Sequence, residues 1–276
     1  MSDNSQTTRA RASYRVSSWL FFLLVFLLSI PFYVLGAAGG RLPIATFLPV
    51  SALMAFIPMI AALVLVYRQS GGDGAKEFLG RAFDYRRIKG VGWILATFLL
   101  MPLVLILEYG VHSFSGAALP DAQLFSIAEG LEFFLMFFVG AIGEELGWQG
   151  YAFAGLRERW SALESGLILG AVWAVWHVIP YAEMGWSGDW IIWQFLGTIA
   201  LRVIIVWLFV NAGQSVFIAV LFHTMTNIAW GLFPNYGSYY DPLMMFVIMA
   251  LVAGIVVALW GPATLAQFRY TRSTTD

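Results

Sequence analysis

Residues 242–260, PLMMFVIMALVAGIVVALW, contain no charged side chain and are numerous enough to cross the hydrocarbon core of a bilayer as an α-helix. Seven other apolar stretches of similar or greater length precede this one. A helix that spans a bilayer needs roughly 20 largely apolar residues. We therefore predict an all-α, polytopic transmembrane helix bundle with eight spans, at residues 17–37, 46–67, 91–110, 126–156, 162–181, 190–210, 214–233 and 242–260.

The composition of the 276-residue chain agrees with a membrane location. Hydrophobic residues make up 60% of the chain and charged residues only 11%, whereas an ordinary soluble domain is about 25% charged. The loops between spans leave no room for a soluble domain, so we expect residues 1–276 to form a single integral membrane domain. We expect this multi-pass protein in the cell (inner) membrane.

Charge and cysteine content exclude several classes of function. The formal net charge of −1, from 15 basic and 16 acidic residues, excludes a basic nucleic-acid-binding protein. The absence of cysteine excludes disulfides, iron–sulfur clusters and thiolate zinc sites. The expected partners are therefore the lipid bilayer and other membrane-associated molecules, and not nucleic acid.

The positions of lysine and arginine predict the orientation of the bundle. With the N-terminus in the cytoplasm, inside segments hold 13 of the 15 basic residues, Arg41 lies outside and Arg202 lies within a span. This asymmetry is typical of cytoplasmic loops, so we predict that both termini are cytoplasmic. The first span could be a cleaved signal sequence, because Gly36-Ala37-Ala38 offers small residues, but its apolar run is longer than usual and predicts a retained helix. The fourth span is too long for the hydrocarbon and should protrude from it.

A few polar residues stand out because they lie at membrane depth, where ionisable side chains are costly and usually functional. At about 1.5 Å per residue, four of them lie roughly 13–22 Å from the cytoplasmic ends of their helices. They come from three different spans, so they share one layer near the middle of the membrane. These four are Glu144, His177, His223 and Asn227, and the further buried polar residues are Glu145 and Arg202.

Helical spacing predicts which way these side chains face. Four glycines between 140 and 150 form a smooth stripe on the fourth span, which Glu144 flanks while Glu145 points nearly opposite. His177 returns to a stripe of small residues on the fifth span, and the residues spaced by four from His223 are small or polar. We therefore predict that the four polar residues converge on one site, whereas Trp148, Trp173 and Trp176 serve packing or lie at the membrane interface.

The chemistry available to this set is hydrolysis. A carboxylate beside an imidazole can deprotonate a water molecule, and a second histidine with an amide can donate hydrogen bonds to an oxyanion. Glu144, His177 and His223 equally match the three protein ligands of a catalytic zinc ion. The sequence leaves both possibilities open, zinc or a metal-free water, and it lacks the usual pair of zinc-binding histidines four residues apart.

Three motifs resemble those of the CPBP family, the CAAX proteases and bacteriocin-processing proteins. Residues 144–151, EELGWQGY, resemble its EExxxR motif, and residues 173–177, WAVWH, resemble its second motif, an aromatic residue four positions before a histidine. Residues 223–227, HTMTN, resemble its third motif, HxxxN or HxxxD. The motifs follow in the family's order on three successive apolar segments, so we expect residues 130–232 to form the catalytic core.

The resemblance implies an all-helical intramembrane endopeptidase, often described as a metalloprotease. Glu144 would be the catalytic carboxylate, with His177 as its partner in activating water. His223 and Asn227 would form the oxyanion hole, or His223 would be a metal ligand with Glu144 and His177. Glu145 would support the site. The implied substrate is a membrane-associated protein, which in the eukaryotic branch is a prenylated CAAX protein.

One position departs from the family pattern. Gln149 stands where the motif has arginine, and a neutral amide cannot make the charged bidentate contact of a guanidinium. We hypothesise that Arg202 supplies the missing positive charge to Glu145 or Glu144. Two alternatives remain, namely a non-catalytic bacteriocin-immunity or partner-binding protein of the same fold, and a proton-coupled transporter, which would lack the internal repeat that many transporters show.

Overall fold

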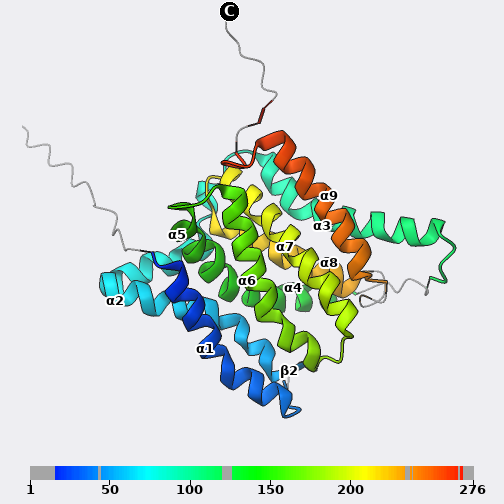
Figure 1. Ribbon diagram of the computed structural model, residues 1–276, viewed down its shortest axis with the longest axis horizontal. Helices are drawn as coiled ribbons and strands as arrows, with labels where there is room; N and C mark the ends of the chain where they lie inside the picture. The colour runs from blue at the N-terminus through cyan, green and yellow to red at the C-terminus, as the bar shows by residue number, and fades with distance from the viewer. Residues whose placement is uncertain are drawn as a thin grey trace, which may run out of the picture.

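The computed structural model is almost entirely helical (Figure 1). A short two-stranded hairpin is the exception. The residues that the structure describes are 16–42, 45–119, 126–233, 237, 239–266 and 268–269. Their elements are α1 (Ser18–Ala37), β1 (Arg41–Leu42), β2 (Ala45–Pro49), η1 (Val50–Phe56), α2 (Ile57–Gly80), η2 (Arg81–Phe83), η3 (Tyr85–Arg87), α3 (Val91–Phe114), α4 (Ile127–Gly147), the π-helix η4 (Trp148–Ala152), α5 (Phe153–Arg157), α6 (Ala162–Glu183), α7 (Gly188–Asn211), α8 (Val216–Leu232) and α9 (Pro242–Trp260).

The predicted all-α polytopic bundle is confirmed. Six helical stretches of the described chain are long and apolar enough to cross a membrane, and α8 is a shorter apolar helix. The protein is therefore an integral, multi-pass membrane protein. The total of eight spans and the cytoplasmic termini stay predictions. The six stretches are Ser18–Ala37, Val50–Phe83, Val91–Phe114, Ala162–Glu183, Gly188–Asn211 and Pro242–Trp260.

The predicted start of the second span, 46–67, was wrong. Residues Ala45–Pro49 form strand β2, which runs antiparallel to β1 with Pro49 paired to Arg41. A 3-10 helix follows before α2 begins. Proline has no N–H to donate and holds an extended conformation here, with φ −66° and ψ 159° at Pro49. At the other end, the helix continues to Gly80 across a kink at Gly71, whose φ of 61° suits glycine.

The fourth span, 126–156, is not one uninterrupted α-helix. Helix α4 ends at Gly147, and a π-helical turn at Trp148–Ala152 leads into the short α5. The buried residues of α4 begin at Ala141, and Ile127 at its start is 93% exposed. The C-terminal half of α4 is thus central and its N-terminal half peripheral.

The segments predicted to face the cytoplasm gather at one end of the bundle. Before α8, the Ser215 hydroxyl donates a hydrogen bond to Asp84 (2.7 Å), between η2 and η3. At the end of α7, the Asn211 side chain donates to the carbonyl of Leu265 (2.7 Å), beyond α9. Successive helices must alternate in direction to produce this grouping. Four basic residues counted for this side lie outside the described part of the chain, namely Arg9, Arg11, Arg15 and Arg272.

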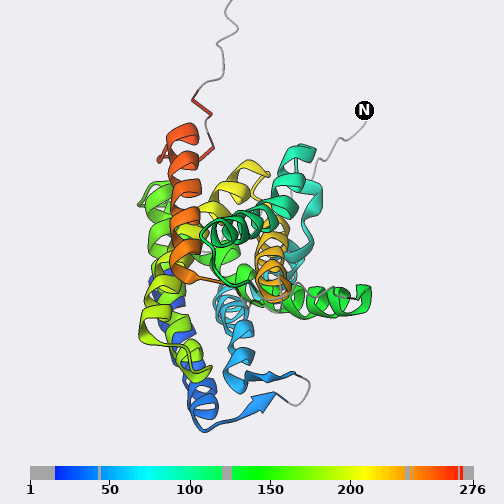
Figure 2. The same ribbon diagram turned by 90° about the vertical axis from the view of Figure 1, so that its right-hand side faces the viewer.

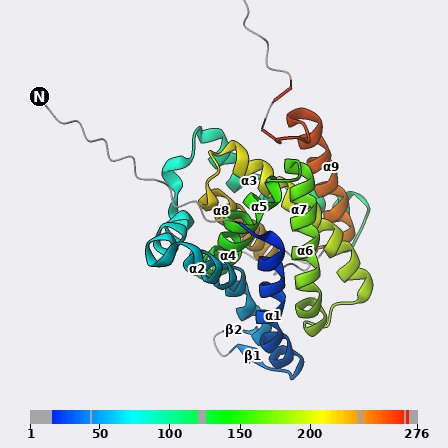
Figure 3. The same cartoon turned by 60° about the vertical axis from the view of Figure 1, so that its left-hand side comes forward.

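The β1–β2 hairpin marks the opposite end (Figure 2). There the carboxylate of Glu183, the last residue of α6, accepts a hydrogen bond from the Ser51 hydroxyl in η1. The same carboxylate fills the space where Gly36 of α1 lacks a side chain. Helix α1 lies between α2 and α6 (Figure 3), so these contacts close the bundle on that side.

Two glycines of the α4 stripe pack against the beginning of the second membrane helix. Gly143 lies against the backbone of Ala55 and the ring of Phe56, and Gly147 lies against Pro58. Because the stripe faces this way, the opposite side of α4 is turned toward α7 and α8. Close approach at the glycines therefore positions Glu145 in the interior.

We predict that Gly147→Ala destabilises the protein. A Cβ at this position would lie 2.4 Å from the backbone carbon of Pro58, so α4 and α2 would have to separate. We expect a loss of about 1–3 kcal/mol in thermal or denaturant unfolding of detergent-solubilised protein. Gly140→Ala on the same helix is the matched control, since no described atom of another element lies within 4 Å of its added Cβ. Equal stability of the two variants would contradict the packing argument.

Candidate active site

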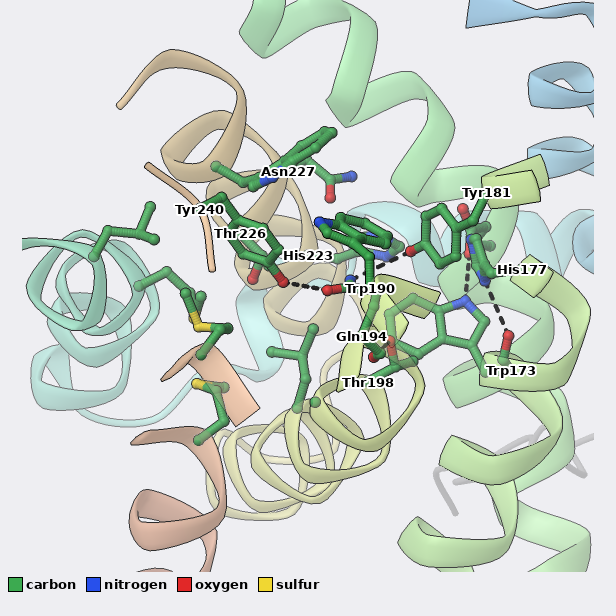
Figure 4. A pocket seen from close by; sticks show the side chains of 18 residues that line it. Trp173, His177, Tyr181, Trp190, Gln194, Thr198, His223, Thr226, Asn227 and Tyr240 are labelled. Atoms are coloured by element: carbon green, nitrogen blue, oxygen red, sulfur yellow. Dashed lines mark hydrogen bonds between the residues drawn. The ribbon is translucent and has the colours of Figure 1, made fainter. Parts of the chain in front are cut away.

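The four residues predicted to converge line one cavity of about 140 Å³ (Figure 4). Helix α4 contributes Glu144, α6 contributes His177, and α8 contributes His223 and Asn227. Helices α3, α7 and α9 contribute mostly apolar side chains to the same cavity. The predicted convergence is therefore present, and three helices distant in sequence bring a carboxylate, two imidazoles and an amide to one space.

Glu144 is buried, with 7% of its surface exposed, and one of its oxygens is held by a tryptophan. The indole Nε1–H of Trp173 donates to Glu144 Oε2 at 2.7 Å. A charge-assisted hydrogen bond of this kind restricts the orientation of the carboxylate. Oε1 has no hydrogen bond to any described residue, so it remains able to accept one from a molecule in the cavity.

The ring of His177 is oriented by the backbone of its own helix. Its Nδ1 lies 2.9 Å from the carbonyl oxygen of Trp173, one turn earlier. A carbonyl only accepts hydrogen bonds, so Nδ1 carries the proton and the lone pair of the neutral ring is on Nε2. Edge-on indole rings of Trp173 and Trp176 and the stacked ring of Tyr181 hold the imidazole in place.

Behind the cavity, Glu145 forms a buried network with α7 and α8. Its Oε2 accepts from Arg202 at 2.6 Å and its Oε1 lies 2.9 Å from His223 Nδ1. Both side chains of the Glu145–Arg202 pair have no exposed surface. The hypothesised ion pair of Arg202 is thus present, with Glu145 as its partner. The carboxylate also orients His223, whose Nδ1–H must donate to it.

Trp173 connects the two glutamates, contrary to the expectation that it serves only packing or lies at the membrane interface. Besides donating to Glu144, its ring lies under the guanidinium of Arg202, with 4.1 Å between Cζ and the ring centroid. The ring also contacts His177 and His223 edge-on. A cation–π contact of this kind in a desolvated site contributes about 2 kcal/mol. Trp148 and Trp176 are fully buried and pack against each other.

Gln149, which departs from the motif, lies in the π-helix and is 1% exposed. Neither atom of its side-chain amide has a hydrogen-bond partner among the described residues. It therefore does not take over the charged contact of the motif's arginine. The positive charge beside Glu145 comes instead from Arg202 on α7.

The described part of the chain does not provide a metal site. No group of three or more His, Asp or Glu side chains in it is arranged to hold a metal ion. Glu144, His177 and His223 share the cavity, but they do not meet this requirement. We therefore derive no chemical step from a metal.

Sequence reasoning missed a second polar group in the cavity. The Tyr240 hydroxyl donates to Gln194 Oε1, and Gln194 Nε2 donates to the Tyr181 hydroxyl at 3.4 Å. Burial raises the pKa of Tyr240 well above its usual value, which keeps this hydroxyl protonated. Tyr181 could have been found from its position one turn after His177 on the same helix face, and Gln194 as an amide within an apolar span.

The fold and the cavity define an integral membrane protein with a buried carboxylate–imidazole site. Residues 126–229, which include all four predicted cavity residues, match the family model of Type II CAAX prenyl endopeptidases described as Rce1-like. A curated relative, CAAX prenyl protease 2 of Methanococcus maripaludis, is 27% identical in an alignment 237 residues long that covers 79% of this chain and 85% of the relative. These likenesses confirm the resemblance predicted from the three motifs and support endopeptidase activity in the membrane.

We predict that Arg202→Gln destabilises the protein strongly, because Glu145 would be left buried without a counter-charge. Breaking a buried ion pair costs about 3–5 kcal/mol. Removing both charges in Glu145→Gln with Arg202→Gln should recover most of this loss, since two amides can pair without a charge imbalance. Unfolding of the purified variants in detergent measures both effects. Additive losses in the double variant would show that the pair is not coupled.

Proposed function

We propose that the protein is an intramembrane endopeptidase that hydrolyses a peptide bond of a membrane-associated protein of the CAAX type. The single observation that supports this best is the shared cavity of Glu144, His177, His223 and Asn227. It contains both halves of a hydrolytic site, a base for water and donors for an oxyanion. The name of the archaeal relative supports a prenylated CAAX substrate.

Water activation falls to Glu144 and His177. Glu144 is fixed through Oε2 by Trp173, which leaves Oε1 to accept a hydrogen bond from water. His177 is fixed through Nδ1, which leaves the lone pair of Nε2 directed away from its backbone anchor. A water molecule between the two would lose a proton to the pair as its oxygen bonds to the substrate carbonyl carbon.

Oxyanion stabilisation falls to His223 and Asn227. His223 already donates through Nδ1 to Glu145, so it donates through Nε2 as well only as the imidazolium, whose charge the adjoining carboxylate balances. The imidazolium then has an Nε2–H, and Asn227 has an amide N–H, for the developing negative charge.

The proton balance closes without a further reactant. The proton taken from water is delivered to the amide nitrogen as the C–N bond breaks. The products are a new carboxyl terminus and a free amine, and the Glu144–His177 pair returns to its starting state. The burial of Glu144 and His223 strengthens the electrostatic interactions that they make.

Arg202 removes the main reason to prefer the alternative that the protein is not an enzyme. Gln149 favoured an immunity or partner-binding protein only because the motif's positive charge was missing from its usual position. Arg202 supplies a buried positive charge to Glu145 through the 2.6 Å contact. The departure at position 149 therefore does not leave the paired glutamates without a counter-charge, and the catalytic function stands as the proposal.

We expect Glu144→Gln and His177→Ala each to reduce cleavage at least about 100-fold, because each removes one half of the base. The assay uses purified protein in lipid vesicles, an S-farnesylated peptide ending in a CAAX sequence, and mass spectrometry of the released fragment. The same peptide without the lipid tests the substrate class. Thermal unfolding checks that the variants fold. Undiminished cleavage by both variants would overturn the proposed site.

We expect cleavage to persist after dialysis of the protein against a chelator. The reason is geometric, since the described His, Asp and Glu side chains form no group of three that suits a metal ion. The measurement is the same peptide assay before and after dialysis. Activity that disappears with the chelator and returns with added Zn²⁺ would support the metal alternative for Glu144, His177 and His223.

A further inference from the structure

A chain of hydrogen bonds with a fixed direction runs through the cavity and ends at a hydroxyl group whose hydrogen has no acceptor among the described residues. Gln194 Oε1 can only accept, so the Tyr240 hydroxyl donates to it. Gln194 Nε2 can only donate, so the Tyr181 hydroxyl oxygen accepts at this contact. The hydroxyl proton of Tyr181 is thereby left over, and no described residue accepts it.

The position of Tyr181 places this proton beside the reacting groups. Its ring stacks on His177, with 5.6 Å between ring centroids and 26° between planes. In Figure 4, its hydroxyl points away from α6 into the cavity that Glu144 and His223 also line. A phenol in contact with the water-activating imidazole can therefore reach a bound substrate.

Tyr181 and Asn227 also occupy equivalent places on their helices. Each lies four residues, or about 6 Å, beyond a histidine of the site. Helices α6 and α8 both start at the same end of the bundle, because the N–H of Ala162 in α6 donates to the carbonyl of Ala263 and the side chain of Asn211, before α8, donates to that of Leu265. Both side chains also line the same cavity, so they border one space.

From these contacts we infer that Tyr181 is a further catalytic residue, whose hydroxyl donates a hydrogen bond to the oxygen of the substrate carbonyl as it becomes an oxyanion. Gln194 and Tyr240 act through Tyr181 as positioning residues, because their chain of bonds turns its proton toward the substrate. The phenol keeps its proton throughout, so the proton balance of hydrolysis does not change. This inference rests on the proposed endopeptidase function.

The test is the steady-state kinetics of Tyr181→Phe with the farnesylated CAAX peptide in vesicles. Removing one oxyanion donor should lower kcat roughly 10- to 100-fold and leave KM within about twofold, because the bond is strongest in the transition state. Tyr67→Phe is the matched control, since the exposed hydroxyl of Tyr67 on α2 is not in the cavity. Thermal unfolding checks that both variants are folded at the assay temperature.

A second variant changes the direction of the bonds and retains the Tyr181 hydroxyl. In Gln194→Glu, a carboxylate accepts from both tyrosines, so the proton of Tyr181 is turned away from the substrate. We expect a fall in kcat similar to that of Tyr181→Phe. An unchanged kcat in both variants, or an increase in KM alone, would overturn the role of Tyr181. A wild-type protein that cleaves no peptide would instead overturn the proposed function, and this inference with it.

Discussion

The ion pair between Glu145 and Arg202 is the constraint on which the rest of the site depends. Its two atoms are 2.6 Å apart and neither side chain has exposed surface. Charges taken out of water are tolerated only when they are paired in good geometry. The pair therefore fixes α4 against α7, and the second oxygen of Glu145 fixes the imidazole of His223 on α8. One buried carboxylate thus sets the relative positions of three helices.

Two adjacent glutamates acquire different tasks because successive residues on a helix point about 100° apart. The glycines of α4 press against α2, so Glu145 is turned toward α7 and neutralised there. Glu144 instead reaches the cavity, where a single indole N–H holds it and leaves one oxygen available. Trp173 touches both environments, since the ring that donates to Glu144 also lies under the guanidinium of Arg202.

Much of this arrangement could be predicted from the sequence because it follows from helical periodicity. Spacing by three and four placed Glu144, His177 and His223 on faces that meet. The sequence did not predict the extended strand that ends at Pro49 or the π-helical turn after Gly147. Apolar composition does not distinguish these conformations from an α-helix. Bonds between distant elements, such as those that Gln194 makes, have no local signature at all.

The glutamine at position 149 shows that an interaction can be kept when the motif residue that usually makes it is absent. A motif records spacing along the chain, whereas a buried carboxylate requires a positive charge near it in space. Position 149 is one turn after Glu145, and an arginine on α7 supplies the same charge from another helix. The guanidinium of Arg202 also contacts the face of the Trp173 ring. The counter-charge of Glu145 is therefore coupled to the tryptophan that holds Glu144, which an arginine within the motif does not by itself ensure.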